Sequence, residues 1–561
     1  MRLINAKTLE FDEFFDSQVP RYGILSHTWE KEEVTLRDMR KRPPSVTAKK
    51  GYRKVTETCR LALEHGLDWV WVDTCCIDKT SSAELTESIN SMFRWYQQAA
   101  ICFVYLSDLS TRDNLEVRLP ACRWFTRGWT LQELIAPKDV SFYDKKWQPR
   151  GTKISLVNII NTITGISIPA LKSESRLSRF SVAKRMSWAA RRTTTRAEDT
   201  AYSLLGIFDV NMPLIYGEGI NAFRRLQEEI MRKSSDVTIL AWEDTESTWE
   251  NTLFAPSPAG FTVHMVGVLG GRSTSSLYSD AHNTAQESSM TNRGWRIETR
   301  LLKLSDKSSG NLVYLLKLGV VWVQGVGETT VGITLEKVGP HLFTRQQRSL
   351  TIVLPTLYTI ANPPLLTCRQ NFFIARDAHD WENIEEFELH EIFTFPCPVE
   401  KAIPESYWDE SSRIFYRSPQ ESLAFSALVT KTVEGLDLQL LVLIDQGLEV
   451  PKAYLLYPPK NPGLMEWFNC DKAAREPHSL SELTFQLGKD RPTLSEKIEI
   501  IVDGSPLWVS VRLVDNFANR GPFEHGSALG MGRRHYQVRL DVEYPRIDDL
   551  WTFGKEDGDG D

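Results

Sequence analysis

The chain lacks the features that mark several large classes of protein. Its eight cysteines are scattered without paired spacing and nowhere form two CxxC pairs, so a zinc-ribbon type of metal site is excluded. No uncharged apolar run reaches the ~18 residues of a membrane-spanning helix, and even LVYLLKLGVVWV is interrupted by Lys317. The N-terminus has no long apolar segment typical of a secretory signal. We therefore expect a soluble, reduced, cytoplasmic protein with no membrane span and no metal.

Nucleotide-binding signatures and excess positive charge are also missing. The first predicted strand is not followed by GxGxxG, and GxxxxGK[ST] occurs nowhere, which excludes an ordinary Rossmann site and a P-loop module. The formal net charge is −7, with a basic cluster only between residues 41 and 54. This balance argues against a nucleic-acid partner, which favours a basic surface.

The first part of the chain alternates predicted strands and helices. The total of 561 residues, 42% of them hydrophobic, is enough for two or three globular domains. Alternation of this kind indicates a doubly wound, flavodoxin-like parallel sheet with helices on both faces. The predicted strands cover residues 22–26, 69–72, 101–106 and 140–143, and the predicted helices cover about 52–65, 154–163, 221–233 and a segment that starts after Ser81.

From about residue 250 the sequence changes to strand-like runs separated by turns. Regular short strands with little helical periodicity favour a β-sandwich or jelly roll. A strand at 237–242 is expected to end or bridge the first domain. We predict an α/β domain at 1–245, divided into a core at about 20–165 and a helical extension at 166–245. A β-rich domain at 246–550 and an acidic disordered tail at 551–561 follow.

The segment 122–143 carries the strongest candidate for a catalytic residue, Glu133. Pro137 ends the preceding helix after about two turns, because proline lacks an N–H and disfavours helical geometry at the residue before it. Trp129 and Glu133 stand four residues apart and therefore project from one helix face. This arrangement fits a site, but it fits equally a structural glutamate paired with Arg123 or Arg127.

Further candidate site residues follow the carboxyl ends of predicted strands, where ligands of such sheets gather. We expect them to meet Glu133 in one cleft. Ser26 and His27 could bind ribose hydroxyls or phosphate, and Trp29 and Trp129 could stack on a base. The set that we predict to bind substrate is Ser26, His27, Trp29, Asp73, Asp78, Arg127 and Trp129.

Each of these residues also has a structural interpretation. The tryptophans could be core residues, since the chain contains 17 of them. Asp73 and Asp78 could cap the following loop and helix, or together bind a cation. A third interpretation pairs His27 with Cys75 or Cys76 as a nucleophile, but cysteines beside a buried strand are more often core residues.

Three long motifs in this order support a family resemblance. YGILSHTW (22–29), WVDTCCIDK (71–79) and RGWTLQELIAP (127–137) resemble the fungal heterokaryon-incompatibility (HET) domain. The resemblance continues through RAEDTAYSLLGIFDVNMPLIYGEG (196–219) to about residue 245. It implies a role in fungal self/non-self recognition and induced cell death, with self-association through this domain and an unknown protein trigger.

The same region also resembles the Toll/interleukin-receptor (TIR) domain. That domain begins with a strand that ends in a serine-containing loop, and it later has a helix of the pattern W-C-x-x-E-L. GWTLQEL matches this pattern except that Thr130 replaces the cysteine. In enzymatic TIR domains the glutamate is catalytic in NAD hydrolysis, so this resemblance assigns that role to Glu133, with NAD as substrate and no resident cofactor. The alternative is a non-enzymatic death-signalling adaptor that acts through protein contacts.

Overall fold

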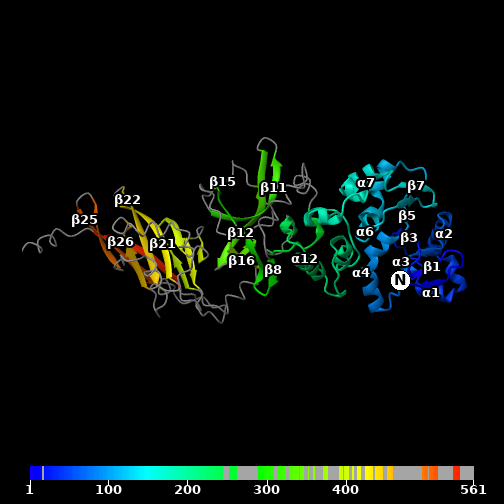
Figure 1. Ribbon diagram of the computed structural model, residues 1–561, viewed down its shortest axis with the longest axis horizontal. Helices are drawn as coiled ribbons and strands as arrows, with labels where there is room; N and C mark the ends of the chain where they lie inside the picture. Colours follow the sequence, from blue (N-terminus) through cyan, green and yellow to red (C-terminus); the bar gives the residue numbers. More distant parts are fainter. Residues whose placement is uncertain are drawn as a thin grey trace, which may run out of the picture.

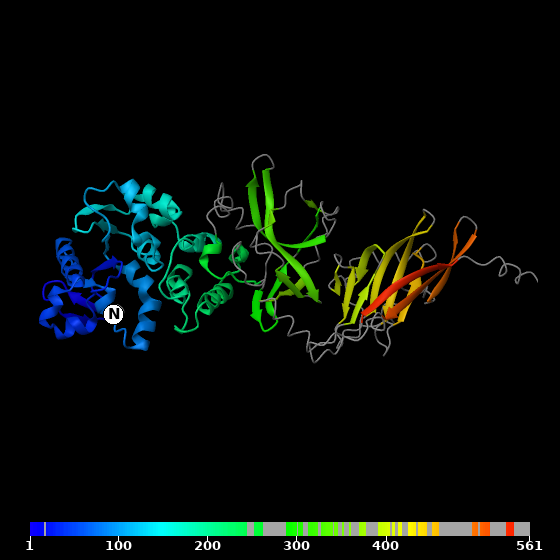
Figure 2. The same cartoon turned by 180° about the vertical axis from the view of Figure 1, so that it is seen from behind.

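The molecule consists of three parts that follow one another along its long axis (Figures 1 and 2). The computed structural model describes residues 1–15, 18–243 and 252–261 and, beyond them, segments between 288 and 543 that carry the strands named below. An α/β part with added helices lies at the N-terminal end, and two β-rich parts follow (Figure 1). The predicted sequence of an α/β part followed by a β-rich part is confirmed. The predicted tail at 551–561 lies outside the described residues.

The N-terminal sheet is mixed, so the prediction of a wholly parallel sheet was wrong. Its order is β2-β1-β4-β3-β5-β6-β7. The inner strands pair in parallel, whereas β1, β2 and β7 pair antiparallel at the two edges. The sequence does not predict these three strands because they are only three or four residues long and lack a continuous apolar run. The strands are β1 (Arg2–Asn5), β2 (Phe11–Glu13), β3 (Tyr22–His27), β4 (Trp69–Trp71), β5 (Ile101–Tyr105), β6 (Val140–Tyr143) and β7 (Pro149–Thr152).

The helices of the core connect the parallel strands, as the alternating pattern predicts. Ser81 caps α4 by accepting a hydrogen bond from the backbone N–H of Glu84. The face of α4 that carries Ile89, Met92 and Tyr96 is buried. The core helices are α1 (Leu36–Lys41), α2 (Lys50–Glu64), α3 (Asp73–Cys76), α4 (Ser82–Gln98), α5 (Leu115–Arg118), α6 (Thr130–Ile135) and α7 (Val157–Thr164).

The structure of the helical extension confirms one prediction made from the sequence and contradicts another. The amphipathic helix α12 spans Asn221–Lys233, as predicted. The strand predicted at 237–242 is wrong, because Val237–Leu240 form a 3-10 helix that Asp236 caps at the N–H of Thr238. The other helices of the extension are α8 (Ile168–Leu171), α9 (Val182–Ser187), α10 (Asp199–Tyr202) and α11 (Leu205–Phe208).

The β-rich half contains three sheets among its described residues. A nine-stranded sheet includes β8 (Ser288–Thr291), β9 (Gly294–Thr299), β10 (Leu302–Asp306), β11 (Leu312–Val323), β12 (Gly327–Gly339), β13 (Leu342–Arg345), β14 (Thr351–Ile352), β15 (Tyr358–Ile360) and β16 (Gln370–Ile374). A six-stranded sheet includes β17 (Glu391–Thr394), β19 (Trp408–Asp409), β20 (Ile414–Arg417), β24 (Lys497–Val502), β25 (Ser505–Asp515) and β26 (His535–Glu543). A four-stranded sheet includes β18 (Val399–Ile403), β21 (Ala424–Val433), β22 (Leu436–Asp445) and β23 (Lys452–Leu456). The last two sheets share one hydrophobic core.

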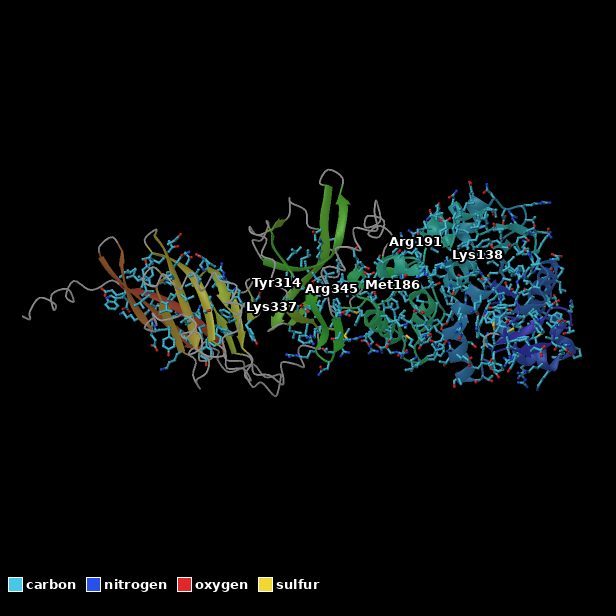
Figure 3. All side chains as sticks on the ribbon, in the orientation of Figure 1. Lys138, Met186, Arg191, Tyr314, Lys337 and Arg345 are labelled. Atoms are coloured by element: carbon cyan, nitrogen blue, oxygen red, sulfur yellow. The ribbon has the colours of Figure 1, made fainter. Side chains whose placement is uncertain are left out.

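The first hydrophobic core runs without interruption from the N-terminal sheet into the nine-stranded sheet, from Leu3 to Ile374. Arg345, labelled on the middle part in Figure 3, is buried at this junction. Its guanidinium donates hydrogen bonds to the backbone oxygens of Leu240 (3.3 Å) and Trp242 (2.7 Å). The helical extension and the nine-stranded sheet are thus packed together, and a boundary near residue 245 stays a prediction. No helix within the described residues has the length and apolar character needed to cross a membrane.

Candidate active site

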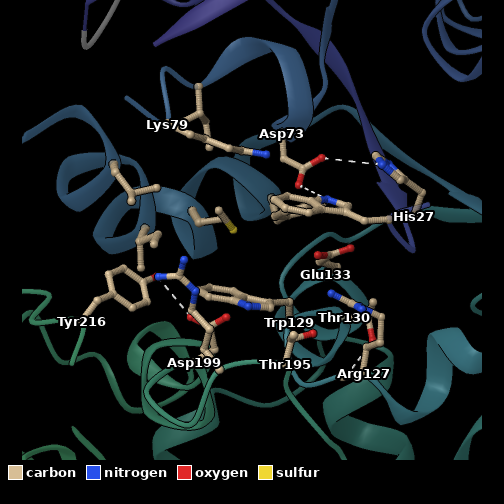
Figure 4. A pocket seen from close by; sticks show the side chains of 17 residues that line it. His27, Asp73, Lys79, Arg127, Trp129, Thr130, Glu133, Thr195, Asp199 and Tyr216 are labelled. Atoms are coloured by element: carbon tan, nitrogen blue, oxygen red, sulfur yellow. Dashed lines mark hydrogen bonds and ion pairs between the residues drawn. The ribbon is translucent and has the colours of Figure 1, made fainter. Parts of the chain in front are cut away.

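A pocket of about 430 Å³ lies at the carboxyl ends of β3 and β4, between the core and the helical extension (Figure 4). Figure 4 shows Glu133 between Asp73 and Lys79 on one side and Asp199 and Tyr216 on the other. Parallel strands that end side by side leave a crevice of this kind. The lining residues are His27, Trp29, Asp73, Ile77, Lys79, Leu85, Ile89, Met92, Tyr96, Arg127, Trp129, Thr130, Glu133, Thr195, Arg196, Asp199 and Tyr216.

Glu133 lies on the short helix α6 and is 8% exposed. Its carboxyl group accepts a hydrogen bond from the hydroxyl of Ser26. Burial raises the pKa of Glu133 to about 8, because the charged form loses hydration. The carboxylate of Asp73 also raises this pKa, whereas the hydrogen bond from Ser26 and the charge of Arg127 lower it. Near neutral pH the group is therefore largely protonated, and a positive charge placed beside it would favour the ionised form.

The structural interpretation of Glu133 as one half of a salt bridge does not match its contacts. Neither Arg123 nor Arg127 lies within ion-pair distance of Glu133 among the described contacts. Arg123 instead approaches Glu30 at 3.8 Å and Asp108 at 3.9 Å, and it does not line the pocket. Arg127 lines the pocket, at a distance from which its charge still acts on Glu133.

Asp73 lies at the rim of the pocket, near Trp29, His27 and Lys79. One carboxylate oxygen accepts a hydrogen bond of 2.7 Å from the indole of Trp29, and the other lies 3.9 Å from Nε2 of His27. The ammonium of Lys79 lies 3.5 Å from the ring centroid of Trp29.

His27 also lies 3.8 Å from Glu33, and neither of its ring nitrogens has a hydrogen-bond partner among the described residues. Burial, assisted by the charge of Lys54, lowers the pKa of His27 to about 3, so the imidazole is neutral at physiological pH.

The opposite wall comes from the helical extension and was not predicted. Asp199 at the start of α10 accepts a hydrogen bond of 3.1 Å from the hydroxyl of Tyr216. Burial raises the pKa of Asp199, and hydrogen bonds from Trp129 and Tyr216 partly offset this. The guanidinium of Arg196 lies 4.6 Å from the ring centroid of Tyr216. All three wall residues fall within the motif RAEDTAYSLLGIFDVNMPLIYGEG, which was the available signal that this segment belongs to the site.

The structure brings together six of the eight predicted site residues. Those that line the pocket are His27, Trp29, Asp73, Arg127, Trp129 and Glu133. Ser26 is fully buried behind Glu133 and does not line the pocket. Asp78 also does not line the pocket. Its carboxylate accepts hydrogen bonds from the N–H (2.9 Å) and the hydroxyl (2.6 Å) of Thr80 instead. Asp78 therefore has the capping role that aspartates at loop starts often have.

The thiol interpretation finds no support in the surroundings of the two cysteines. Cys75 and Cys76 are both buried, and their sulfur atoms contact the backbone oxygen and the N–H of Val72, respectively. The neighbouring thiol of Cys76 and burial together raise the pKa of Cys75 well above its usual range, which disfavours a reactive thiolate. Among the described residues, no group of three His, Cys, Asp or Glu side chains could hold a metal ion.

Comparisons with known proteins connect part of the chain to an established family. Residues 22–121 match the family described as Heterokaryon incompatibility protein (HET), which confirms the resemblance for that segment, and Glu133 lies beyond the matched residues. Residues 221–257 match a domain of unknown function (DUF8212). The chain is also similar to the Vegetative incompatibility protein HET-E-1 of Podospora anserina, with 50% identity over 223 residues. The match covers 38% of this chain and only 16% of that relative. No solved structure matches the chain significantly.

Proposed function

We propose that the chain acts in heterokaryon incompatibility and that its N-terminal part hydrolyses a nicotinamide nucleotide in the pocket around Glu133. The family match of residues 22–121 and the relative with 50% identity support the first half of this proposal. The observation that carries the second half is the position of Glu133. It lines the pocket without an ion-pair partner among the described residues, beside two tryptophans and an arginine. A buried, charged glutamate with a purely structural role would be expected to have a cationic partner.

The proposed reaction breaks the bond between C1′ of the ribose and the nicotinamide nitrogen. The bonding electrons leave with nicotinamide, and positive charge develops on the ribose. Water then adds to C1′ and loses one proton, so that NAD⁺ and water become ADP-ribose, nicotinamide and H⁺. A carboxylate held beside the ribose stabilises the developing cation, as in glycosidases. Glu133 would supply this carboxylate, and the positive charge of the substrate's ring would favour its ionised form despite the raised pKa.

Other lining residues suit the remaining parts of such a substrate. The guanidinium of Arg127 makes no hydrogen bond or ion pair with any described side chain, which leaves it available for a pyrophosphate. Trp129 offers an aromatic surface on which a ring can stack. The volume of about 430 Å³ lies within the range of small-molecule sites.

The order of the parallel strands supports the TIR-like interpretation of the core. Read in chain order, β4-β3-β5-β6 is the arrangement 2-1-3-4, with which the flavodoxin-like order begins. Glu133 lies between the third and fourth of these strands, on the helix GWTLQEL that carries the resemblance. Fold resemblance alone does not establish chemistry, so the proposal depends on the pocket itself.

A non-enzymatic adaptor is the second candidate, and exposed apolar side chains favour it. Trp29 is 45% exposed, and Ile215 and Ile220, which lie within four residues of the pocket-lining Tyr216 in sequence, are 50% and 46% exposed. Exposed apolar groups of this size suit contact with a protein partner or with a second copy of the chain. In this case Glu133 would have no chemical role.

Expression in a fungal host distinguishes the two candidates. We would compare the wild type, Glu133→Gln and the matched control Glu87→Gln, which changes an exposed glutamate of α4 that does not line the pocket. The proposal predicts that the wild type and the control kill and deplete cellular NAD, whereas Glu133→Gln does neither. Loss of a carboxylate that stabilises the transition state costs on the order of 3 kcal/mol, or about a hundredfold in rate. Killing by the wild type at a constant NAD level would refute the enzymatic proposal and favour the adaptor. NAD loss in Glu133→Gln at the wild-type rate would refute the assignment of the site.

A further inference from the structure

We propose that Ser26 and Trp124 form a hydrogen-bond relay that orients the carboxyl group of Glu133 and directs its proton to the oxygen Oε1. The relay gives Ser26 a positioning role in place of the substrate contact expected from the sequence. Its meaning for catalysis rests on the proposed function. The hydrogen bonds themselves are a property of the chain and can be tested without substrate.

The hydrogen-bonding capacity of the three groups favours one direction for the relay. An indole nitrogen can only donate a hydrogen bond. The indole of Trp124 lies 2.7 Å from the hydroxyl oxygen of Ser26, so this oxygen must be the acceptor. The single hydrogen of the hydroxyl is then available for Oε2 of Glu133, with which Ser26 forms its second hydrogen bond. Trp124 is 1% exposed and Ser26 is not exposed at all, so no bulk water competes for these bonds.

This direction determines which carboxyl oxygen carries the proton. Oε2 accepts the hydrogen bond from Ser26, so a proton on Glu133 belongs on Oε1. Donation by Ser26 also stabilises the ionised form and lowers the pKa of Glu133, against the effect of burial. The other groups that act on Glu133 are Asp73, Arg127, Tyr96 and, from the helical extension, Arg192. Of these, Tyr96 also lowers the pKa of Glu133 through a hydrogen bond, and its hydroxyl lies 3.0 Å from the backbone oxygen of Leu25 as well.

The segment that carries Trp124 is itself held in place from two sides. The hydroxyl of Thr130, the first residue of α6, lies 2.5 Å from the backbone oxygen of Trp124. Arg192 of the helical extension donates hydrogen bonds of 2.8 Å to this hydroxyl and to the backbone oxygen of Arg127. The extension therefore braces the start of α6 and, through Trp124, the relay to Glu133. Fixed supporting groups of this kind are what hold a reactive side chain in a productive geometry.

The test is to titrate the carboxyl group of Glu133 in the full-length protein without nucleotide. Infrared difference spectra between each protein and its Glu133→Gln counterpart isolate this group. Ser26→Ala should raise the pKa of Glu133 by about one unit, because the ionised form loses a donor. Ser26→Thr keeps the hydroxyl and should restore the wild-type titration. Trp124→Phe should cause a smaller rise, because the Ser26 hydroxyl can then turn away. Ser88→Ala, which removes another buried serine, on α4, is the matched control and should have no effect.

Kinetics give a second measurement if the chain consumes nicotinamide nucleotide. Ser26→Ala should lower kcat at pH 7 at least tenfold, change KM less than about twofold and shift the pH profile upward. Unchanged titration of Glu133 in Ser26→Ala, or an equal shift in Ser88→Ala, would overturn the relay. If Ser26→Ala does not fold, Trp124→Phe and Ser26→Thr decide the question, since only the former should shift the pKa. A shifted titration, together with killing by the wild type at a constant cellular NAD level, would uphold the relay while refuting the proposed function.

Discussion

The indole of Trp29 donates a hydrogen bond of 2.7 Å to Asp73, and this contact organises the rim of the candidate site. Trp29 is 45% exposed, so burial alone does not hold its ring in place. Lys79 lies over one face of the ring and Asp73 lies at its edge, an arrangement in which a cation and a carboxylate act on the same indole. The negative charge of Asp73 also acts on Glu133 and raises its pKa. Asp73 therefore both holds Trp29 at the rim of the pocket and acts through its charge on Glu133, the proposed catalytic group.

Replacing Asp73 by Asn should weaken binding of a nucleotide with a positively charged nicotinamide ring more than it weakens the fold. The Asn side chain can still accept the hydrogen bond from Trp29, but the negative charge is lost. We expect the dissociation constant of NAD⁺, measured by calorimetry, to rise about five- to tenfold, which corresponds to about 1 kcal/mol. Asp78→Asn is the matched control, because it removes the same charge outside the pocket. Equal weakening by both variants would show that Asp73 acts only through the net charge of the chain.

Replacing Glu133 by Gln should make the protein more stable at alkaline pH. The pKa of Glu133 is raised from 4.5 to about 8 in the folded protein, so the folded state binds more protons than the unfolded state between these values. Stability from this group is therefore present below pH 4.5 and is lost as the pH rises through 8. Since Gln cannot ionise, the variant should match the wild type near pH 4.5 and exceed it by about 2 kcal/mol or more at pH 9.

Denaturant unfolding of the wild type and Glu133→Gln across this pH range measures the difference directly. The subtraction cancels groups that both proteins share, such as His27, whose lowered pKa of about 3 changes stability between pH 3 and 6.5 instead. A constant difference between the two proteins from pH 4.5 to 9 would mean that Glu133 is not titrating in a buried site.

The sequence predicts those elements of the N-terminal part that carry a strong local signal. The strand Val140–Tyr143 and the helix Asn221–Lys233 have the predicted bounds, since an apolar run and a 3.6-residue period identify them. The strand Arg2–Asn5 carries no such signal. It pairs antiparallel with β4, a contact set by tertiary structure rather than by the four residues themselves.

The sequence likewise predicts only part of the candidate site. Strand-end positions predict that His27, Asp73 and Glu133 converge, because parallel strands end at one edge of the sheet. The fully buried position of Ser26 behind Glu133 depends on how Trp124 packs, and strand position alone does not reveal it. The wall formed by Asp199 and Tyr216 comes from a segment far along the chain, which only the folded extension brings to the pocket.

Replacing Arg345 by Met should destabilise the junction between the helical extension and the nine-stranded sheet. Arg345 is 2% exposed, lies 4.0 Å from the ring centroid of Trp242 and donates to two backbone oxygens. Met fills similar space but leaves these oxygens unpaired, so we expect a loss of about 3 kcal/mol in the free energy of unfolding. Arg512→Met, which removes an exposed ion pair with Asp541, should lower the free energy of unfolding far less, because water screens this pair. Equal losses in denaturant unfolding would contradict the structural role of the junction.

The segment that follows residue 245 completes the packing of the helical extension. Gln227 on α12 forms two hydrogen bonds with the backbone of Ala255, at 2.9 and 3.0 Å. The indole of Trp242 donates to the backbone oxygen of Leu253 at 3.1 Å. Leu253, Phe254 and Phe261 belong to the first hydrophobic core and are 0–3% exposed.

A fragment of residues 1–261 should therefore be more stable than a fragment of residues 1–245. The shorter fragment loses three buried apolar side chains, each worth about 1.5–3 kcal/mol, and leaves the amide of Gln227 without its backbone partner. Both fragments lack Arg345 and the nine-stranded sheet, so their comparison isolates residues 246–261. Thermal unfolding should show a transition at least about 5 °C higher for the longer fragment. Gln227→Ala should lower this transition in the longer fragment and change it little in the shorter one. Equal transitions in the two fragments would instead place the end of the first folded unit at the predicted boundary near residue 245.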